Sequence, residues 1–101
     1  MPTYRRFLIS ILIATLLTGT AFALDGEKYL ADASVKPAHA RATALKTYPG
    51  KIVSEELEKE SGGSGLRYSF VIRHHTAKHE VGIDAKTGAV LENSVEGKNP
   101  D

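Results

Sequence analysis

Apolar and polar residues alternate along the second half of the chain, and this alternation predicts β-strands. The clearest strand places four large apolar side chains on one face, at Leu66, Tyr68, Phe70 and Ile72. A later strand carries Val81 and Ile83 at alternate positions, and the segment from Asp84 to Gly88 has the Asp start and Gly finish of a type I turn. A short last strand begins at Val90 and Leu91.

The segment before these strands has the spacing of an amphipathic helix from Ser34 to Thr47. Its predicted inward face carries Ala38, Ala42 and Leu45. Ser34 is the predicted N-cap, because its hydroxyl can accept a hydrogen bond from a free amide of the first turn. Pro49 and Gly50 follow the helix and end it.

A first strand is predicted from Ile52 to Lys59, with Val53 and Leu57 on one face. The apolar faces of helix and strands escape water only against each other. We therefore predict an α+β fold, with one helix packed on one face of a three- to four-stranded antiparallel sheet in meander order. The opposite face of the sheet is expected to be charged and wet.

The alternation also predicts a register for the hairpins. Leu57 has to face the same way as Tyr68 or Phe70, which places Glu58 or Glu60 opposite Arg67. In the second hairpin we pair Ile72 with Val81, and three further cross-strand pairs follow: Phe70 with Ile83, Arg73 with Glu80, and His74 with His79.

The start of the chain has the pattern of a secretory signal peptide. Arg5 and Arg6 precede an apolar run from Phe7 to Leu17, and Ala21-Phe22-Ala23 has the small-x-small form of a cleavage site. We expect residues 1–23 to be removed, with an uncleaved membrane anchor as the alternative. The remaining segments are a polar lead at 24–33, a domain at 34–95 and a polar tail at 96–101.

Charge and cysteine content narrow the function classes. Without residues 1–23 the chain has 11 Lys and Arg against 12 Asp and Glu, a net charge of −1. This near-neutral balance gives no field that would attract nucleic acid or acidic lipid, so we expect no nucleic-acid partner, and membrane contact only through an uncleaved signal segment. The chain contains no cysteine, so no disulfide stabilises the exported domain.

Three histidines near the second hairpin form the candidate metal site. His74 and His79 face each other in the register above, and His75 can add a third ligand from the turn. The competing interpretation is a solvated turn that contains histidines, because the four fixed ligands of a structural zinc site are absent. We identify no catalytic constellation, since strand alternation splits the glutamates of the first strand between two faces.

The order and spacing of these segments resemble the PepSY family over about Ser34 to Glu92. The most specific part is the block from Val81 to Val90, in which an Asp, a small residue and a Thr-Gly turn close the sheet. The resemblance implies a non-enzymatic binding or inhibitory module outside the cytoplasm, in the periplasm or secreted. It names no cofactor and no catalytic residues. No peptidase domain accompanies the segment, so we expect action on a separate protein.

These observations favour an exported module that binds another envelope protein, with a peptidase as a candidate target. We place the partner at the edge of the first strand, with Ile52, Ser54, Glu56 and Glu58 as contact residues and the Ser54 amide as an edge donor. Two alternatives remain. One is a periplasmic metal-binding or sensing module built on the histidine hairpin, and the other is a structural accessory domain of an envelope complex.

Overall fold

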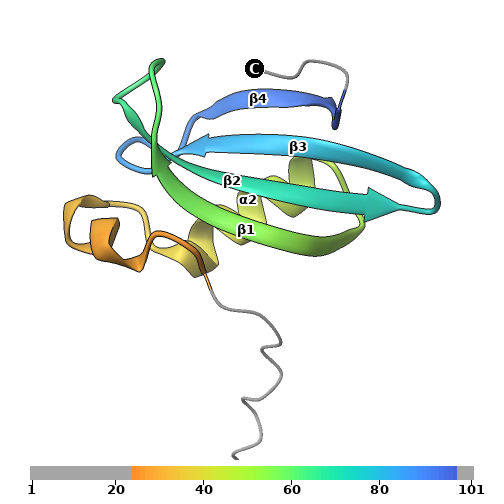
Figure 1. Cartoon of the computed structure of the whole chain (residues 1–101), viewed down its shortest axis with the longest axis horizontal. Coiled ribbons are helices and arrows are strands. Elements are labelled where there is room, and N and C mark those ends of the chain that lie inside the picture. Colours follow the sequence, from red (N-terminus) through yellow and green to blue (C-terminus); the bar gives the residue numbers. More distant parts are fainter. Residues whose placement is uncertain (1–23, 98–101) are drawn as a thin grey trace, which may run out of the picture.

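A computed structural model describes residues 24–97 and contains one α-helix on a four-stranded antiparallel sheet (Figure 1). The elements in chain order are η2 (Glu27–Asp32), α2 (Pro37–Thr47), β1 (Lys51–Lys59), β2 (Leu66–His74), β3 (Ala77–Asp84) and β4 (Val90–Val95). The strands lie in the order β1-β2-β3-β4. The predicted α+β fold and meander order are confirmed. The predicted signal segment and residues 98–101 of the tail lie outside the described residues.

The core lies between α2 and one face of the sheet. The four alternating residues of β2 are all buried, as the pattern predicted, and Tyr68, Phe70 and Ile72 are fully inaccessible. They pack with the other buried apolar residues: Leu57, Val81, Ile83, Ala85 and two alanines of the helix, Ala40 and Ala44. Within residues 24–97, no helix is long and apolar enough to cross a membrane.

The inward face of α2 differs from the predicted one. Ala40 and Ala44 are buried, whereas Ala38 and Ala42 are exposed and Leu45 is half-buried. Alanines occur on two opposite sides of this helix, so its sequence defines no single apolar stripe, and packing against the sheet decides its rotation. The predicted cap is also wrong, because the helix begins at Pro37 and its N-cap is Lys36, which makes no side-chain capping bond.

A β-bulge in β1 changes which residue faces the helix. Ile52 pairs with Ile72, but the next paired residue is Ser54, opposite Val71. Val53 is the extra residue, and it is Ile52 that packs with the core, so our expectation that Val53 shares the face of Leu57 is wrong. Beyond the bulge the register follows the prediction, with Glu58 opposite Arg67.

The second hairpin pairs two residues away from the predicted register. Phe70 lies opposite Val81, Ile72 opposite His79, and His74 opposite Ala77. The predicted pairing would have left a four-residue connection, whereas the observed turn contains two residues. His75 allows this tight turn by adopting a left-handed conformation with φ 58°. The faces were predicted correctly, but the individual partners were not.

Asp84 fixes the end of the sheet at which the β1–β2 loop meets the β3–β4 turn. Its carboxylate accepts hydrogen bonds from the backbone of Ser64 at 2.7 Å, the Ser64 hydroxyl at 2.8 Å, and the amides of Lys86 and Thr87 at 2.8 and 3.1 Å. Burial alone would raise its pKa, but these four bonds favour the carboxylate and lower the pKa to about 2.

Candidate functional site

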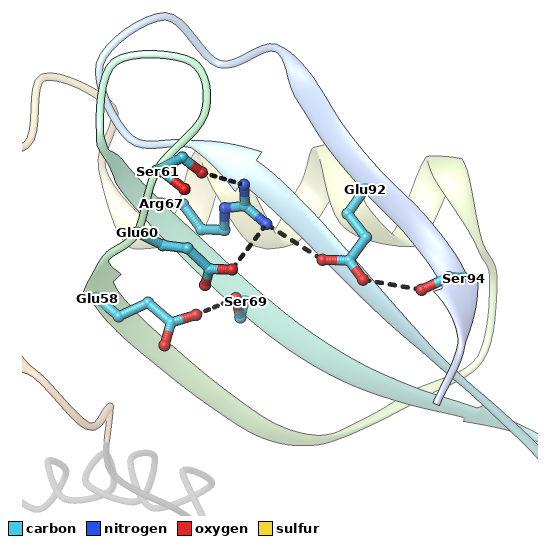
Figure 2. A network of polar contacts seen from close by, with 7 residues as sticks. All are labelled: Glu58, Glu60, Ser61, Arg67, Ser69, Glu92 and Ser94. Atoms are coloured by element: carbon cyan, nitrogen blue, oxygen red, sulfur yellow. Dashed lines mark hydrogen bonds and ion pairs between the residues drawn. The ribbon is translucent and has the colours of Figure 1, made fainter. Parts of the chain in front are cut away.

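The face of the sheet that α2 leaves uncovered carries a network centred on Arg67 (Figure 2). The guanidinium Nη1 donates to Glu92 Oε1 at 3.1 Å and lies 3.9 Å from Glu60 Oε2, while Nη2 donates to the Ser61 carbonyl at 3.4 Å. These partners come from the β1–β2 loop and from β4, so the network crosses the sheet from edge to edge. The Arg67 side chain is only 9% exposed.

A glycine in β3 makes room for this arginine. A Cβ on Gly82 would lie 3.2 Å from Arg67 Cδ and 3.3 Å from Nη1, so a larger residue would push the side chain away. Glycine inside a strand commonly marks such a close approach. Arg67 Nε is buried and has no hydrogen-bond partner among the described residues. The arrangement holds a cation in place between carboxylates and leaves one of its donors unused.

Two further carboxylate contacts extend the network along the same face. Glu58 Oε2 accepts from the Ser69 hydroxyl at 2.7 Å, and Glu92 Oε2 accepts from the Ser94 hydroxyl at 2.8 Å. Ser69 is 5% exposed although no helix covers it. Long acidic side chains therefore lie over the centre of the face and give it negative charge.

Three of the four predicted partner-contact residues share this face. Ser54, Glu56 and Glu58 lie opposite Val71, Ser69 and Arg67, in the row that points away from α2. Ile52 instead packs on the helix side, so the structure does not bring all four together.

The edge of β1 is partly occupied by the chain itself. The Leu57 amide donates to the Asp25 carbonyl at 2.8 Å, and the Asp25 amide donates to the Glu55 carbonyl at 3.3 Å. Backbone groups of a strand alternate in direction, so the N–H of Ser54 points towards β2. Our expectation that Ser54 is an edge donor is therefore wrong.

An ion pair joins α2 to the helix side of the sheet. Arg41 on α2 makes a two-pronged contact with Glu55, with Nε to Oε1 at 2.7 Å and Nη2 to Oε2 at 3.0 Å. The bond to Glu55 raises the pKa of Arg41. Burial raises the pKa of the neighbouring Tyr68, whose hydroxyl donates to the Val35 carbonyl at 2.7 Å. These contacts hold the helix and the residues before it on the sheet.

Two histidines of the second hairpin contact Tyr48, which follows α2, and the third contacts one of these two. The ring of His79 stacks on Tyr48 with centroids 3.8 Å apart, His74 approaches edge-on at 6.1 Å, and His74 and His75 are 4.4 Å apart. His79 Nδ1 lies 2.7 Å from Asn93 Oδ1. The predicted opposition of His74 and His79 is wrong, because they lie diagonally across the hairpin. Within residues 24–97, no three His, Cys, Asp or Glu side chains are placed to hold a metal ion. Metal binding by these histidines stays a prediction.

Among the described residues, two surface hollows have a volume of about 310 Å³ each. One is lined by Ser34, Val35, Lys36 and His39, and the other by Asp32, Lys59, Ser64, Gly65, Leu66 and Lys86.

Sequence reasoning placed Glu58 or Glu60 opposite Arg67, but it missed the burial of this arginine with its bond to Glu92, and it missed the contact of Asp25 with β1. A glycine inside β3, at position 82, was the one signal for the first. For the second, Asp25-Gly26 has the turn-like composition of a linker, and nothing in its pattern indicates pairing with a distant strand.

The chain matches no curated protein and no solved structure. A family model described as "Peptidase propeptide and YPEB domain", the PepSY family, matches residues 35–93. This segment runs from just before α2 into β4, and so includes the helix, three complete strands, and Arg67 with its partners Glu60, Ser61 and Glu92. Because the match covers more than half of the chain, the protein belongs to the PepSY family.

Proposed function

We propose that this protein is a non-catalytic module that binds another protein outside the cytoplasm, and that its target is a peptidase. PepSY domains are generally non-catalytic, propeptide-like modules and are typically found in exported proteins. The family match over residues 35–93 is the observation that carries the proposal.

The uncovered face of the sheet supports a binding role. Its centre is built from buried polar side chains, Arg67 and Ser69, which hold acidic partners in fixed positions. Glu56 on the same face is exposed. A negative surface fits a basic surface on the partner, since complementary charge favours encounter and correct orientation.

Capture followed by inhibition tests this proposal. The purified protein is immobilised, exposed to the envelope fraction of its own cells, and the recovered proteins are identified and assayed for peptidase activity with and without added module. We expect a recovered peptidase to lose activity in proportion to the amount of module added. Recovery of no protein at all, or of a peptidase whose activity is unchanged, would contradict the proposal.

Charge reversal on the face gives a matched comparison. Glu56→Lys changes an exposed side chain on the uncovered face and should weaken capture of a basic partner about tenfold or more. Glu96→Lys makes the same charge change beyond the far end of β4 and should have a much smaller effect. Equal effects of the two variants would indicate a response to net charge rather than to this surface.

A further inference from the structure

Residues 24–26, which we call the strap, lie along the middle of the outer edge of β1. Asp25 forms a parallel bridge with Glu56. Its N–H donates to the Glu55 carbonyl at 3.3 Å, and its carbonyl accepts from the Leu57 amide at 2.8 Å. The strap therefore behaves as a very short fifth strand at an edge that would otherwise present unpaired backbone groups.

The backbone of β1 restricts position 26 of the strap to glycine. A Cβ at position 26 would lie 1.9 Å from the Leu57 carbonyl oxygen, closer than any real contact. Gly26 also has φ 89°, a left-handed conformation that favours glycine. The backbone of the strap thus passes so close to β1 that only glycine fits after the bridging residue.

Leu24 before the glycine and Tyr29 after it also contact the domain, so these positions restrict which segment can bind. Leu24 and Tyr29 pack against the core cluster and are partly buried. The Tyr29 ring has Lys28 Nζ at 5.2 Å and Lys59 Nζ at 5.4 Å from its centroid. The site therefore accepts an apolar residue, a bridging residue and a glycine, with an aromatic residue three positions after the glycine.

We propose that the edge of β1 from Glu55 to Leu57 is a strand-binding slot, filled here by the strap, and that a partner protein inserts an extended segment with the same apolar-x-glycine pattern. This deepens the proposed binding function and rests on it. Among residues 24–97, two backbone hydrogen bonds hold the strap in the slot, so an incoming segment has few contacts to replace. Addition of a strand to a sheet edge is an established way to recognise extended segments.

The edge of β4 provides the contrast. It exposes Val90 and Val95 at 46% and 47%, yet no described segment of the chain lies along it. Nothing in the structure indicates what would cover that edge. At the edge of β1, by contrast, the bound strap shows which kind of segment binds: an apolar residue, a bridging residue and a glycine.

The test uses the chain's own sequence as the probe. A labelled peptide with the sequence of residues 24–34 is titrated against the wild-type protein, Gly26→Val and Gly97→Val. Gly26→Val prevents the strap from docking, so we expect it to bind the peptide at least tenfold more tightly than wild type, in which the strap competes as an intramolecular ligand. Gly97 is the matched control, because its φ is 87° but a Cβ there would meet nothing within 4 Å.

Hydrogen exchange at the Leu57 amide reports directly on the slot. We expect exchange to be at least tenfold faster in Gly26→Val than in Gly97→Val, and to slow again when the peptide saturates the site. A peptide that itself carries valine in place of the glycine should neither bind nor restore protection. Should Gly26→Val fail to fold, Asp25→Pro removes the donor to Glu55 while keeping the glycine, and the same readouts apply.

Three results would overturn the proposal. The first is a Leu57 amide that stays protected in a folded Gly26→Val protein. The second is an exposed amide that the wild-type peptide does not protect. The third is a wild-type dimer with exchanged straps, which would make a second copy the occupant. Peptide binding does not depend on the envelope capture experiment, so failure of the slot and failure of the proposed function are distinguishable.

Discussion

The two faces of β2 are both buried, but by different means. On the helix side, Leu66, Tyr68, Phe70 and Ile72 are removed from water by α2 and the neighbouring strands. On the other side, Arg67 and Ser69 are 7% and 5% exposed although no helix lies over them. There, glutamates from β1, its loop and β4 fold across the strand and take the place of a second layer.

The two faces contribute to the free energy of folding through different interactions. Burial of apolar side chains is non-directional and large, roughly 1.5 to 3 kcal/mol for a fully buried Leu, Ile, Phe or Val. Ion pairs and hydrogen bonds near a surface contribute less, because the charged groups lose hydration when they pair. We therefore expect the helix side to provide most of the stability and the uncovered side to provide shape and charge for recognition.

Truncation of the central aromatic residue should have the largest effect. Phe70 is fully buried on the helix side, so Phe70→Ala should lower the free energy of unfolding by about 3 to 5 kcal/mol. Val71→Thr changes the next residue, which is half-buried on the uncovered side, and should cost much less. Denaturant melts of the two variants measure the difference. Equal losses in the free energy of unfolding would mean that the helix side does not provide most of the stability.

Asp84→Asn should have the next largest effect. The carboxylate accepts four hydrogen bonds, and an amide cannot accept the Ser64 backbone bond and the three others together, so we expect a loss of about 2 to 3 kcal/mol. Thermal or denaturant melts at pH 7 measure it. Asp32→Asn, on an exposed residue of η2, is the control and should change little.

The same carboxylate gives a pH dependence with a defined sign. Its pKa is about 2 in the folded protein, below the ordinary value of 3.8. The stabilisation is therefore complete above about pH 4 and is lost as the pH falls through 2. Melts at pH 5, 4, 3 and 2 should show wild type losing more stability over this range than Asp84→Asn. Parallel curves for the two proteins would contradict this assignment.

Replacement of Arg67 tests the uncovered face. Arg67→Met keeps much of the side-chain volume and removes the charge, together with a buried Nε that has no partner among the described residues. We expect a cost of only about 1 to 2 kcal/mol, because Glu92 and Glu60 are partly exposed and can return to water. Arg73→Met on the same face is exposed and should cost less than about 0.5 kcal/mol. If Arg67→Met lowers the free energy of unfolding as much as Phe70→Ala does, the uncovered face stabilises the fold as strongly as the apolar core.

The contrast between the faces also explains which features the sequence could predict. Strict alternation at Leu66, Tyr68, Phe70 and Ile72 identified the buried side of β2, and the Asp-to-Gly turn after β3 was recognised from its residue types. The alternation of apolar and polar residues predicts the face of the sheet on which a residue lies. It does not predict the solvent exposure of the polar residues on the other face. Arg67 is held by glutamates from two segments, the β1–β2 loop and β4, and no local pattern contains that information.

Other features depended on local geometry that alternation does not determine. The bulge at Val53 moved Ile52 to the helix side, and the two-residue turn at His75 moved the second hairpin by two positions. The rotation of α2 followed from packing, since alanines occur on two opposite sides of the helix. The candidate site was therefore predicted in part: Ser54, Glu56 and Glu58 share the uncovered face, but the buried cation between the carboxylates was not foreseen.

Metal binding by the hairpin histidines should give the smallest effect. His74 and His79 contact Tyr48 and His75 contacts His74, but the three are not placed as ligands of one ion, so we expect a single weak site with a dissociation constant of tens of micromolar. Zn²⁺, Ni²⁺ or Cu²⁺ at about five times that concentration would stabilise the protein by about 1 kcal/mol. Binding should weaken from pH 7.5 towards pH 5, because protonated imidazoles do not bind metals.

Calorimetric titration of wild type, His74→Ala and His39→Ala measures this site. His74→Ala should abolish binding, whereas His39→Ala removes the exposed fourth histidine on α2 and should leave it unchanged. His79 Nδ1 already contacts Asn93, so a metal ion would have to use Nε2 of that ring, and stacking on Tyr48 restricts how far the ring can turn. Absence of saturable binding at tens of micromolar metal would contradict the metal site. The histidines would then serve only to pack the hairpin against Tyr48.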